Sequence, residues 1–420
     1  MCIRDRWWNG RVARRRCSRG FMTSVEYFTR SLPDFLRELR LFVEIESPTG
    51  EVSQMDRAAA FLRARLAPFG ELSGRELTGF GSLVRLHRPG TGSRVLLLAH
   101  YDTVWPVGSW PELWRQSSGR AYGPGVYDMK CGLLFILWLL RHLDDDDRSH
   151  PTLDIVFTPD EEIGSLASQS HVRHAAAAAD FALVLEPTTL DGGLKVARKG
   201  SGNYFIEVEG RAAHQGAEPE LGANAVVEVA HQILKLHALE DPESGTSVGP
   251  NVVEGGSVPN TVPDRARVAV DVRAWTDSER RRLDRGIRGL EPVLDGTRLH
   301  ITGRWNRPPM EASTASMELF ARARDIAGGL GQTVEAVRWG GASDANFAAA
   351  AGAATIDGLG PVGEGAHQPT ENVVIDSIPP RLALLAELVV SLAQPPESWL
   401  SDAALKQLRD GRPHESVDTG

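Results

Sequence analysis

The chain has few of the features that mark secreted, membrane-spanning or nucleic-acid-binding proteins. Its three cysteines, Cys2, Cys17 and Cys131, cannot all pair and show no C-x-x-C spacing, so no disulfide framework is indicated. The longest apolar run, Leu133–Leu140, spans eight residues, well short of the ~18 that a membrane helix needs. The net charge of −9 argues against nucleic acid as the main partner, because binding phosphates requires a basic surface. We therefore expect neither a membrane nor a nucleic acid among its partners.

The first 21 residues differ in composition from the rest of the 420-residue chain. They contain seven Arg and one Asp, and no apolar run of about 7–15 residues follows the arginines, as it would in a secretory signal. The segment can be interpreted as a basic arm for an acidic partner or as an unstructured or spurious extension, and we favour the extension. The missing signal predicts a cytoplasmic protein.

The remaining sequence has the length and the ordinary composition of two or three globular domains, with 42% hydrophobic and 24% charged residues. Short apolar runs such as Val95–His100 and Leu153–Thr158 predict buried strands, and they alternate with helical patterns such as Met129–Leu143. This alternation is typical of an α/β domain with a mixed, mostly parallel sheet flanked by helices. Between residues 200 and 304 the pattern changes to the strand and helix order of an inserted, ferredoxin-like α+β domain.

The predicted domain boundaries follow from that change in pattern. We expect a catalytic α/β domain over residues 22–199 and 305–396, the inserted domain over 200–304, and a solvated tail over 397–420 with one helix at Ser401–Leu408.

Acidic and imidazole side chains follow several of the predicted strands. In the H-x-D of His100 and Asp102 both side chains point to the same side of the strand, and a carboxylate beside an imidazole is how a metal-binding His is oriented. An ordinary buried His paired with an Asp is the alternative interpretation. Because the carboxyl ends of parallel strands meet at one edge of a sheet, we expect one cluster there, made of His100, Asp102, Asp128, Glu161, Glu162, Glu186 and His367.

The composition of this predicted cluster suits two zinc ions. Two imidazoles and three carboxylates are too many ligands for one catalytic zinc but fit two zincs that share a carboxylate. Of the adjacent Glu161 and Glu162, one can then be a ligand and the other a general base. Two interpretations without a metal remain open at this point: Glu161 and Glu162 could lie in a solvated loop, and His367 could be a surface histidine. The glycine-rich loop at Gly123–Gly125 could instead cradle a phosphate, but it lacks G-x-G-x-x-G.

Five ordered motifs, HYDTV, YGPGVYDMK, TPDEEIGS, LEPT and AHQPTENV, resemble those of the co-catalytic zinc carboxypeptidases and deacylases of metallopeptidase family twenty. That family includes glutamate carboxypeptidase, aminoacylase, acetylornithine deacetylase and succinyl-diaminopimelate desuccinylase. The resemblance covers about residues 31–396, and DTVWPVGSW and AYGPGVYDMK look most like the glutamate carboxypeptidase branch.

The resemblance implies a ligand set for the two metals. One zinc would bind His100, Asp128 and Glu186, and the second would bind Asp128, Glu162 and His367, with Asp128 bridging. Cobalt or manganese would be accepted by the same ligands.

It also implies the catalytic residues. Asp102 would orient His100, and Glu161 would activate the bridging water. The peptide bond between Asp128 and Met129 would be cis.

For the inserted domain, the resemblance implies a lid that also forms a homodimer. His214 would reach the partner's active site to stabilise the oxyanion, while Asn260 and Arg273 would hold the substrate's carboxylate, with Arg307 a further candidate. A surface histidine at position 214 and a strand-edge ion pair of Arg273 are the alternatives.

These inferences predict a zinc metallohydrolase that cleaves an amide next to a free carboxylate. We expect a glutamate-type carboxypeptidase acting on small peptides or N-acyl amino acids. An N-acyl-amino-acid deacylase or a dipeptidase is the alternative. A third interpretation is a catalytically inactive dimeric metal-binding module, but no metal ligand and no general base is missing from the motifs, which argues against it. A two-metal phosphatase or nuclease fits less well, since basic clusters are missing near the motifs.

Overall fold

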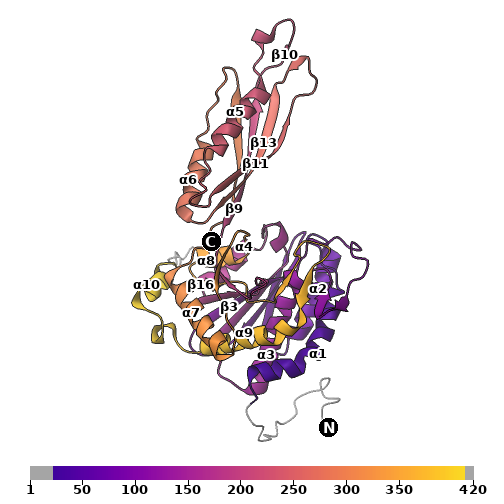
Figure 1. Cartoon of the computed structure of the whole chain (residues 1–420), viewed down its shortest axis with the longest axis vertical. Coiled ribbons are helices and arrows are strands. Elements are labelled where there is room, and N and C mark those ends of the chain that lie inside the picture. The colour runs from indigo at the N-terminus through magenta and orange to yellow at the C-terminus, as the bar shows by residue number, and fades with distance from the viewer. Residues whose placement is uncertain (1–21, 412–420) are drawn as a thin grey trace.

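The computed structural model describes residues 22–411, and its body is built on one six-stranded sheet (Figure 1). The strand order is β1-β2-β6-β3-β7-β16. Strands β6, β3, β7 and β16 run parallel, whereas β2 is antiparallel to both of its neighbours. The predicted mixed, mostly parallel sheet is therefore confirmed. The strands are β1 (Glu71–Leu77), β2 (Gly81–Arg88), β3 (Arg94–His100), β6 (Thr152–Thr158), β7 (Phe181–Val184) and β16 (Ala354–Ile356).

Helices cover both faces of this sheet, as the side chains of β3 show. Val95, Leu97 and Ala99 are buried in one apolar cluster, and the alternating Leu96 and Leu98 belong to a second. The first cluster is formed with α1 (Ser24–Val43), α2 (Val52–Leu66), α3 (Cys131–Asp146), α7 (Thr314–Gly329) and α9 (Ile378–Ser391), and the second with α4 (Gln169–Ala177) and α8 (Ala345–Ala350).

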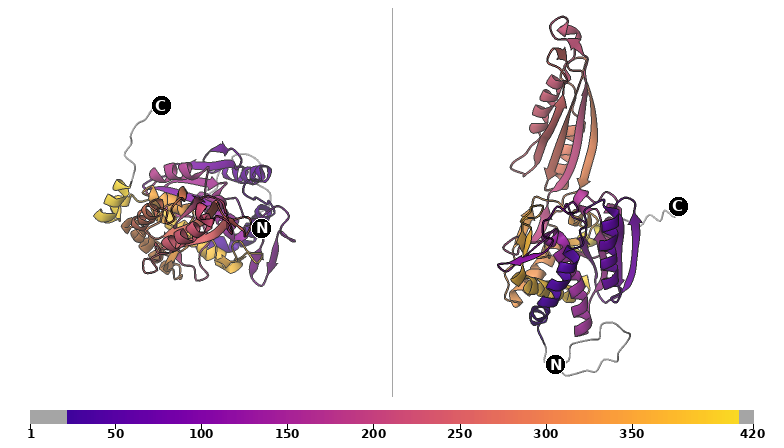
Figure 2. Two further views of the ribbon diagram at one scale, coloured as in Figure 1. Left: turned by 90° about the horizontal axis from the view of Figure 1, so that it is seen from above. Right: turned by 90° about the vertical axis from the view of Figure 1, so that its right-hand side faces the viewer.

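A second domain-like unit stands away from the body as an elongated insertion (Figures 1 and 2). Its antiparallel sheet has the order β11-β13-β9-β14, which is the ferredoxin-like order. Two helices, α5 (Ala225–His237) and α6 (Asp277–Arg288), pack on one face of this sheet. The strands are β9 (Gly200–Glu209), β11 (Ser247–Gly255), β13 (Arg265–Ala274) and β14 (Arg298–Arg307), with a small pair β10 (Ala213–His214) and β12 (Thr261–Val262).

Two small sheets complete the body, and neither is predicted by the sequence. Strands β8 (Leu194–Arg198) and β15 (Ala336–Trp339) pair in parallel. A four-stranded sheet has the order β17-β18-β5-β4. Its strands are β17 (Gly363–Glu364), β18 (Asn372–Val374), β5 (Arg120–Tyr122) and β4 (Arg115–Ser117), and it brings the loop of His367 beside the loop that precedes Asp128.

Residues 397–411 pack onto the body and are not a solvated tail, whereas the helix expected at Ser401–Leu408 is present. Helix α10 (Asp402–Asp410) buries Ala404 and Leu408, and the ring of Trp399 stacks on Phe181 at 5.3 Å. The polar composition does not predict this packing, because two buried apolar side chains one turn apart are enough to dock a short helix. The expectations for residues 1–21 and for the last nine residues lie outside the described part of the chain.

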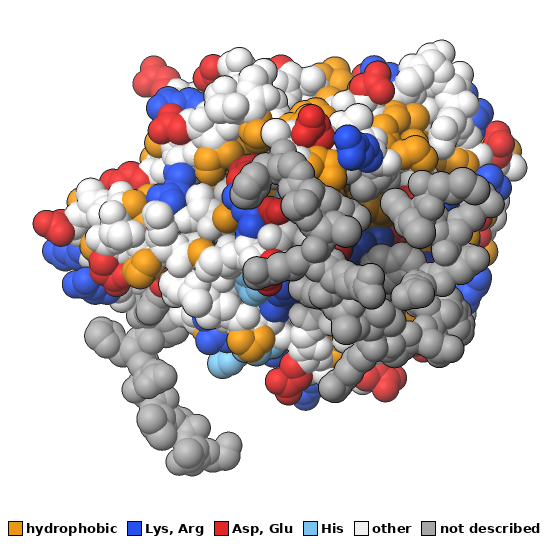
Figure 3. Space-filling view, turned by 90° about the horizontal axis from the view of Figure 1, so that it is seen from below, with side chains coloured by type: hydrophobic (Ala, Val, Ile, Leu, Met, Phe, Trp, Pro, Cys, Tyr) orange, Lys and Arg blue, Asp and Glu red, His pale blue; other side chains and the backbone are white. Residues whose placement is uncertain are grey.

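Two further features concern the surface and the helices. The face of the body turned away from the insertion carries acidic and basic side chains interspersed among apolar ones (Figure 3). Over residues 22–411, no helix combines the length and the apolar character needed to cross a membrane.

Candidate metal centre

His100, the last residue of β3, is oriented on both sides by carboxylates. Its Nδ1 lies 3.0 Å from the backbone oxygen of Asp102 and 3.3 Å from Oδ1 of that residue. Its Nε2 faces Asp128 Oδ1 at 3.1 Å and Glu186 Oε1 at 3.7 Å. Burial opposes the charged imidazole, but Asp102 and Asp128 outweigh it and hold the pKa of His100 well above its usual range.

Asp102 also anchors the turn that carries the two glutamates. Its Oδ1 and Oδ2 accept the backbone N–H groups of Glu161 (3.2 Å) and Glu162 (3.1 Å), and Thr49 donates to Oδ2 at 2.7 Å. One fully buried carboxylate therefore fixes the imidazole of His100 and the 3₁₀ turn Glu161–Ile163 relative to each other.

Asp128 lies between the two histidines. Its Oδ1 faces His100, and its Oδ2 lies 3.4 Å from Nε2 of His367. Burial raises the pKa of Asp128, but the two imidazoles outweigh burial and lower that pKa below its usual range. The peptide bond from Asp128 to Met129 is cis, as the family resemblance implies.

Glu162 and His367 form the far side of the cluster. The His367 Nε2 lies 3.0 Å from Glu162 Oε2, and His367 has φ +61°, a left-handed conformation that is uncommon outside glycine. Burial raises the pKa of Glu162 to about 8. Among the described residues, no hydrogen-bond donor reaches the buried Oε1 of Glu162.

These side chains fit two divalent cations. Ligand atoms of His100, Asp128 and Glu162 lie within 4.8 Å of one another, as do those of His100, Glu161 and Glu186. So many buried carboxylates repel one another unless cations compensate their charge, and the buried Glu162 oxygen without a donor is ready to act as a ligand. The imidazoles on either side of Asp128 match a shared carboxylate.

Glu161 pairs with a buried arginine. Its Oε1 lies 2.8 Å from Nη2 of Arg307. Burial raises the pKa of Glu161 to about 7, although Arg307 acts in the opposite direction. A carboxyl group that titrates near neutral pH can both accept and return a proton, as a general base must.

Of the four predicted substrate-binding residues, the structure brings Arg307 to this cluster, where it pairs with Glu161. Within the described residues of one chain, it does not bring His214, Asn260 or Arg273 there. His214 belongs to β10, at the end of the insertion farthest from the body (Figure 1). Asn260 is exposed beside it, and its backbone oxygen accepts the N–H of Gln215 at 2.9 Å. Arg273 is paired with Asp271 through two 2.8 Å hydrogen bonds, as in the alternative interpretation, although β13 is an interior strand of its sheet and not an edge.

Sequence reasoning missed Glu371, which shapes the loop of Asp128. This fully buried carboxylate accepts four N–H groups, from the Trp105 ring (2.7 Å) and from the backbones of Gly125 (3.1 Å), Tyr127 (2.9 Å) and Asp128 (3.0 Å). Its only signal in the sequence is its place in the last motif, AHQPTENV.

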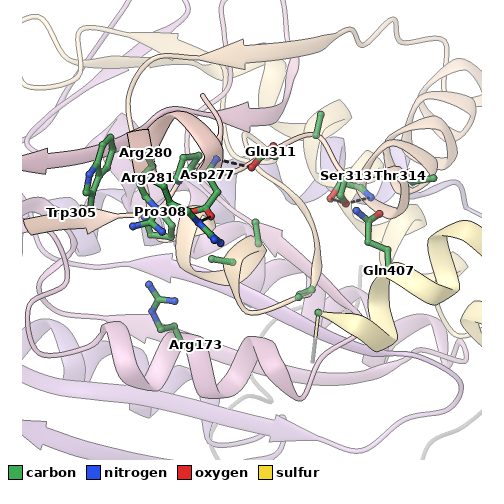
Figure 4. Close-up of a pocket in the computed structure, with 18 of the residues that line it drawn as sticks. Arg173, Asp277, Arg280, Arg281, Trp305, Pro308, Glu311, Ser313, Thr314 and Gln407 are labelled. Atoms are coloured by element: carbon green, nitrogen blue, oxygen red, sulfur yellow. Dashed lines mark hydrogen bonds and ion pairs between the residues drawn. The ribbon is translucent and has the colours of Figure 1, made fainter. Parts of the chain in front are cut away.

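A cavity of about 820 Å³ lies elsewhere, at the junction of the insertion and the body (Figure 4). Arg173 of α4, Arg280 of α6 and Trp305 of β14 are among the residues that line it. None of the clustered acidic and imidazole residues lines this cavity, so the candidate centre rests on the side-chain cluster alone.

Residues 96–391, more than half of the chain, match the family model described as peptidase family M20/M25/M40. The chain belongs to this family. The resemblance drawn from the five motifs is thereby confirmed, and membership in the M20 family makes the protein a metallohydrolase.

Two curated relatives of the M20 family are similar over most of the chain. Carboxypeptidase G2 from Pseudomonas sp. (strain RS-16) is 31% identical over 381 residues, which cover 87% of this chain and 90% of the relative. Succinyl-diaminopimelate desuccinylase from Stenotrophomonas maltophilia (strain K279a) is 30% identical over 325 residues, 72% of this chain and 85% of the relative.

Solved structures share the fold. Aminopeptidase PepT from Bacillus cereus superposes with a TM-score of 0.73 at 20% identity and covers 86% of this chain and 99% of its own. The YXEP protein from Bacillus subtilis, described as a dinuclear metal-binding peptidase of the M20 family, superposes with a TM-score of 0.62 at 15% identity, covering 86% of this chain and 98% of its own.

Proposed function

We propose that the protein is a two-zinc hydrolase that cleaves an amide bond next to a free carboxylate, as a glutamate-type carboxypeptidase acting on peptides or N-acyl amino acids. The observation that carries the proposal is the placement of Asp128, with one oxygen 3.1 Å from His100 Nε2 and the other 3.4 Å from His367 Nε2. The similarity to carboxypeptidase G2 along 87% of the chain supports the choice of substrate class.

The proposed ligands divide into two sets that share Asp128. His100 and Glu186 would complete one set, and Glu162 and His367 the other. Two bound cations would polarise the scissile carbonyl and acidify a water between them. Zinc suits this mixture of imidazole and carboxylate, and cobalt or manganese would also fit.

Glu161 is proposed as the general base. It accepts the proton of the attacking water and passes it to the leaving amine. Asp102 keeps the Nδ1 side of His100 occupied, so that Nε2 faces Asp128. Asn260 and Arg273 are proposed to bind the substrate's carboxylate, through an amide and a planar guanidinium.

We also propose a homodimer formed through the insertion. Strand β11 is an edge of its sheet, and Val252 and Val253 on that strand are each 51% exposed, while Leu234 of α5 is 67% exposed. The His214 Nδ1 accepts the backbone N–H groups of Gly216 and Ala217 at 3.1 Å, so the ring proton is on Nε2. That N–H is free to donate to an oxyanion in the partner's site.

Two variants test the proposed function. Glu161→Gln should keep two zincs per chain and lose turnover, and appreciable residual hydrolysis would refute the role of the base. His214→Ala should be inactive alone and regain activity in mixed dimers with Glu161→Gln chains. The matched control is His237→Ala, because His237 is an exposed histidine of α5. A lack of rescue would show that each subunit has a complete site.

The second candidate function is that of an N-acyl-amino-acid deacylase or a dipeptidase, favoured by the 30% identity to succinyl-diaminopimelate desuccinylase. Release of free amine from C-terminal glutamate peptides, folate-like amides and N-acyl amino acids separates these activities. A metal-binding module without activity would bind zinc and hydrolyse none of them. The cytoplasmic location stays a prediction for cell fractionation to test.

A further inference from the structure

Arg307 is the last residue of β14, the strand by which the chain returns from the insertion to the body. Its side chain is 4% exposed, and its guanidinium bridges two acidic residues. Nη1 donates to Asp344 Oδ1 at 2.9 Å. Nη2 donates to the backbone oxygen of Glu161 at 2.8 Å and lies 2.8 Å from Glu161 Oε1. The side chain of the proposed base therefore meets a buried, planar cation.

The Asp344 end of this bridge is fixed to the body. Thr158, the last residue of β6, donates to Asp344 Oδ2 at 2.9 Å, and the hydroxyl of Ser165 donates to Asp344 Oδ1. The guanidinium of Arg307 lies 5.2 Å above the ring of Phe347 in α8. Because these partners lie on the sheet and on a buried helix, Arg307 presents Nη2 to Glu161 from a rigid support.

The end of β14 lies against the turn that carries Glu161. Gly164, at the end of the turn that carries Glu161, has φ +94°, and a Cβ at this position would lie 2.0 Å from the side-chain nitrogen of Asn306. The end of β14 and the turn of the base therefore form one packed unit, so the return strand of the insertion sets the position of Glu161.

We propose that Arg307 is a positioning residue that aims the Glu161 carboxylate at the metal centre, rather than a residue that binds the substrate's carboxylate. The inference rests on the proposed function, because it assumes that Glu161 is the base. The positioning role explains how the Glu161 carboxylate is oriented. One of its oxygens lies within 4.8 Å of ligand atoms of His100 and Glu186, while its Oε1 pairs with Arg307. The positioning role also accounts for the engagement of both terminal nitrogens of Arg307 inside the protein.

The first test separates the two roles of Arg307 by steady-state kinetics on the zinc-loaded protein. For Arg307→Met we expect kcat to fall about 10²-fold, since misplacing a catalytic group by about 1 Å costs that much, with KM within threefold and zinc content unchanged. The preference for a substrate with a free carboxylate over its amide should be retained. A large rise in KM together with loss of that preference would overturn the proposal in favour of substrate binding.

The matched control is Arg198→Met. Arg198 is 3% exposed and pairs with Asp357 at 2.5 Å, so this variant removes a buried ion pair. Among the described residues, the Arg198 side chain makes no hydrogen bond to Glu161 or Arg307. We expect a comparable fall in melting temperature and a kcat within threefold of the wild type. An equal loss of kcat in both variants would overturn the assignment, because any buried arginine would then have the same effect.

The second test needs no turnover and uses the zinc-free protein. Melting temperatures of Arg307→Met, Glu161→Gln and the double variant form a double-mutant cycle. If Arg307 holds Glu161, the fall in the double variant is smaller than the sum of the two single falls, and strict additivity overturns the proposal. Should Arg307→Met not fold, Arg307→Lys replaces it in the cycle, since an ammonium cannot bridge two carboxylates as a planar fork does.

Failure of the proposed function is a separate outcome. Wild-type protein that hydrolyses no amide, or a fully active Glu161→Gln variant, would remove the role of the base. The thermal coupling between Arg307 and Glu161 would remain measurable in that case, so the contact and the catalytic role are tested independently.

Discussion

Glu371 offers the sharpest test of how the candidate centre is built, through the substitution Glu371→Gln. In the wild type, Oε1 accepts the N–H groups of Tyr127 and Asp128, and Oε2 accepts those of Gly125 and the Trp105 ring. Glutamine keeps one acceptor oxygen and turns an NH₂ group toward the other two donors. Two buried donors then lose their acceptor.

The magnitude follows from the cost of an unsatisfied buried donor, about 1–3 kcal/mol each. For two donors the expected loss is about 2–6 kcal/mol in the free energy of unfolding, a large part of the 5–15 kcal/mol that is usual for a whole domain. Because three of the four donors belong to the loop of Asp128, zinc affinity should fall about 10–100-fold as well, the range seen for residues that orient metal ligands.

Urea unfolding of the zinc-free protein and competition with a zinc chelator measure these two effects. Glu364→Gln is the matched control, because Glu364 lies in the same region of the chain but is 50% exposed and pairs with Arg120 at the surface. We expect it to cost less than about 1 kcal/mol. If Glu371→Gln unfolded within 0.5 kcal/mol of the wild type and bound zinc as tightly, the role given to Glu371 would be wrong.

Three further predictions concern protons and packing. At pH 7 the zinc-free protein should hold protons on Glu162, whose pKa is raised by burial to about 8, and on His367, whose pKa is raised by Asp128 and Glu162 to about 11. Zinc uptake should therefore release protons. A binding enthalpy that does not depend on the ionisation enthalpy of the buffer would contradict this prediction. Burial raises the pKa of Glu38, but two arginines outweigh burial, so the pKa in the folded protein lies below 4.5. Glu38→Gln should therefore lower the free energy of unfolding at pH 7 by about 1–3 kcal/mol. This difference in stability from the wild type should vanish as the pH falls through the lowered pKa. Trp399→Ala should lower the free energy of unfolding by about 2–4 kcal/mol because it removes the stacking on Phe181, and an unchanged urea midpoint would show that the segment after residue 397 does not stabilise the body.

The sequence predicts those parts of the fold whose patterns are long. The buried strands that end at His100 and Thr158 are apolar except for their end residues and Asp154. The polar residues at and directly after their carboxyl ends place His100, Glu161 and Glu162 at one sheet edge. The inserted sheet is predicted for the same reason, since its strands alternate apolar and polar residues.

The rest depends on contacts that no local pattern encodes. Strands of two or three residues, such as Gly363–Glu364, are too short to show a period, so the small sheet beside the centre is missed. Glu371 meets the loop of Asp128 across 243 positions of sequence. In the sequence, Arg307 is a polar residue at the end of a predicted strand. Only the fold shows that it is buried against Glu161 and Asp344.

The central claim, that acidic and imidazole side chains hold two cations around Asp128, is tested most directly by anomalous diffraction at the zinc edge from crystals of the zinc-loaded protein. The account predicts two peaks about 3.5–4 Å apart, one beside His100 and Glu186 and the other beside Glu162 and His367. A single peak, or peaks that leave Asp128 without a metal contact, would contradict it.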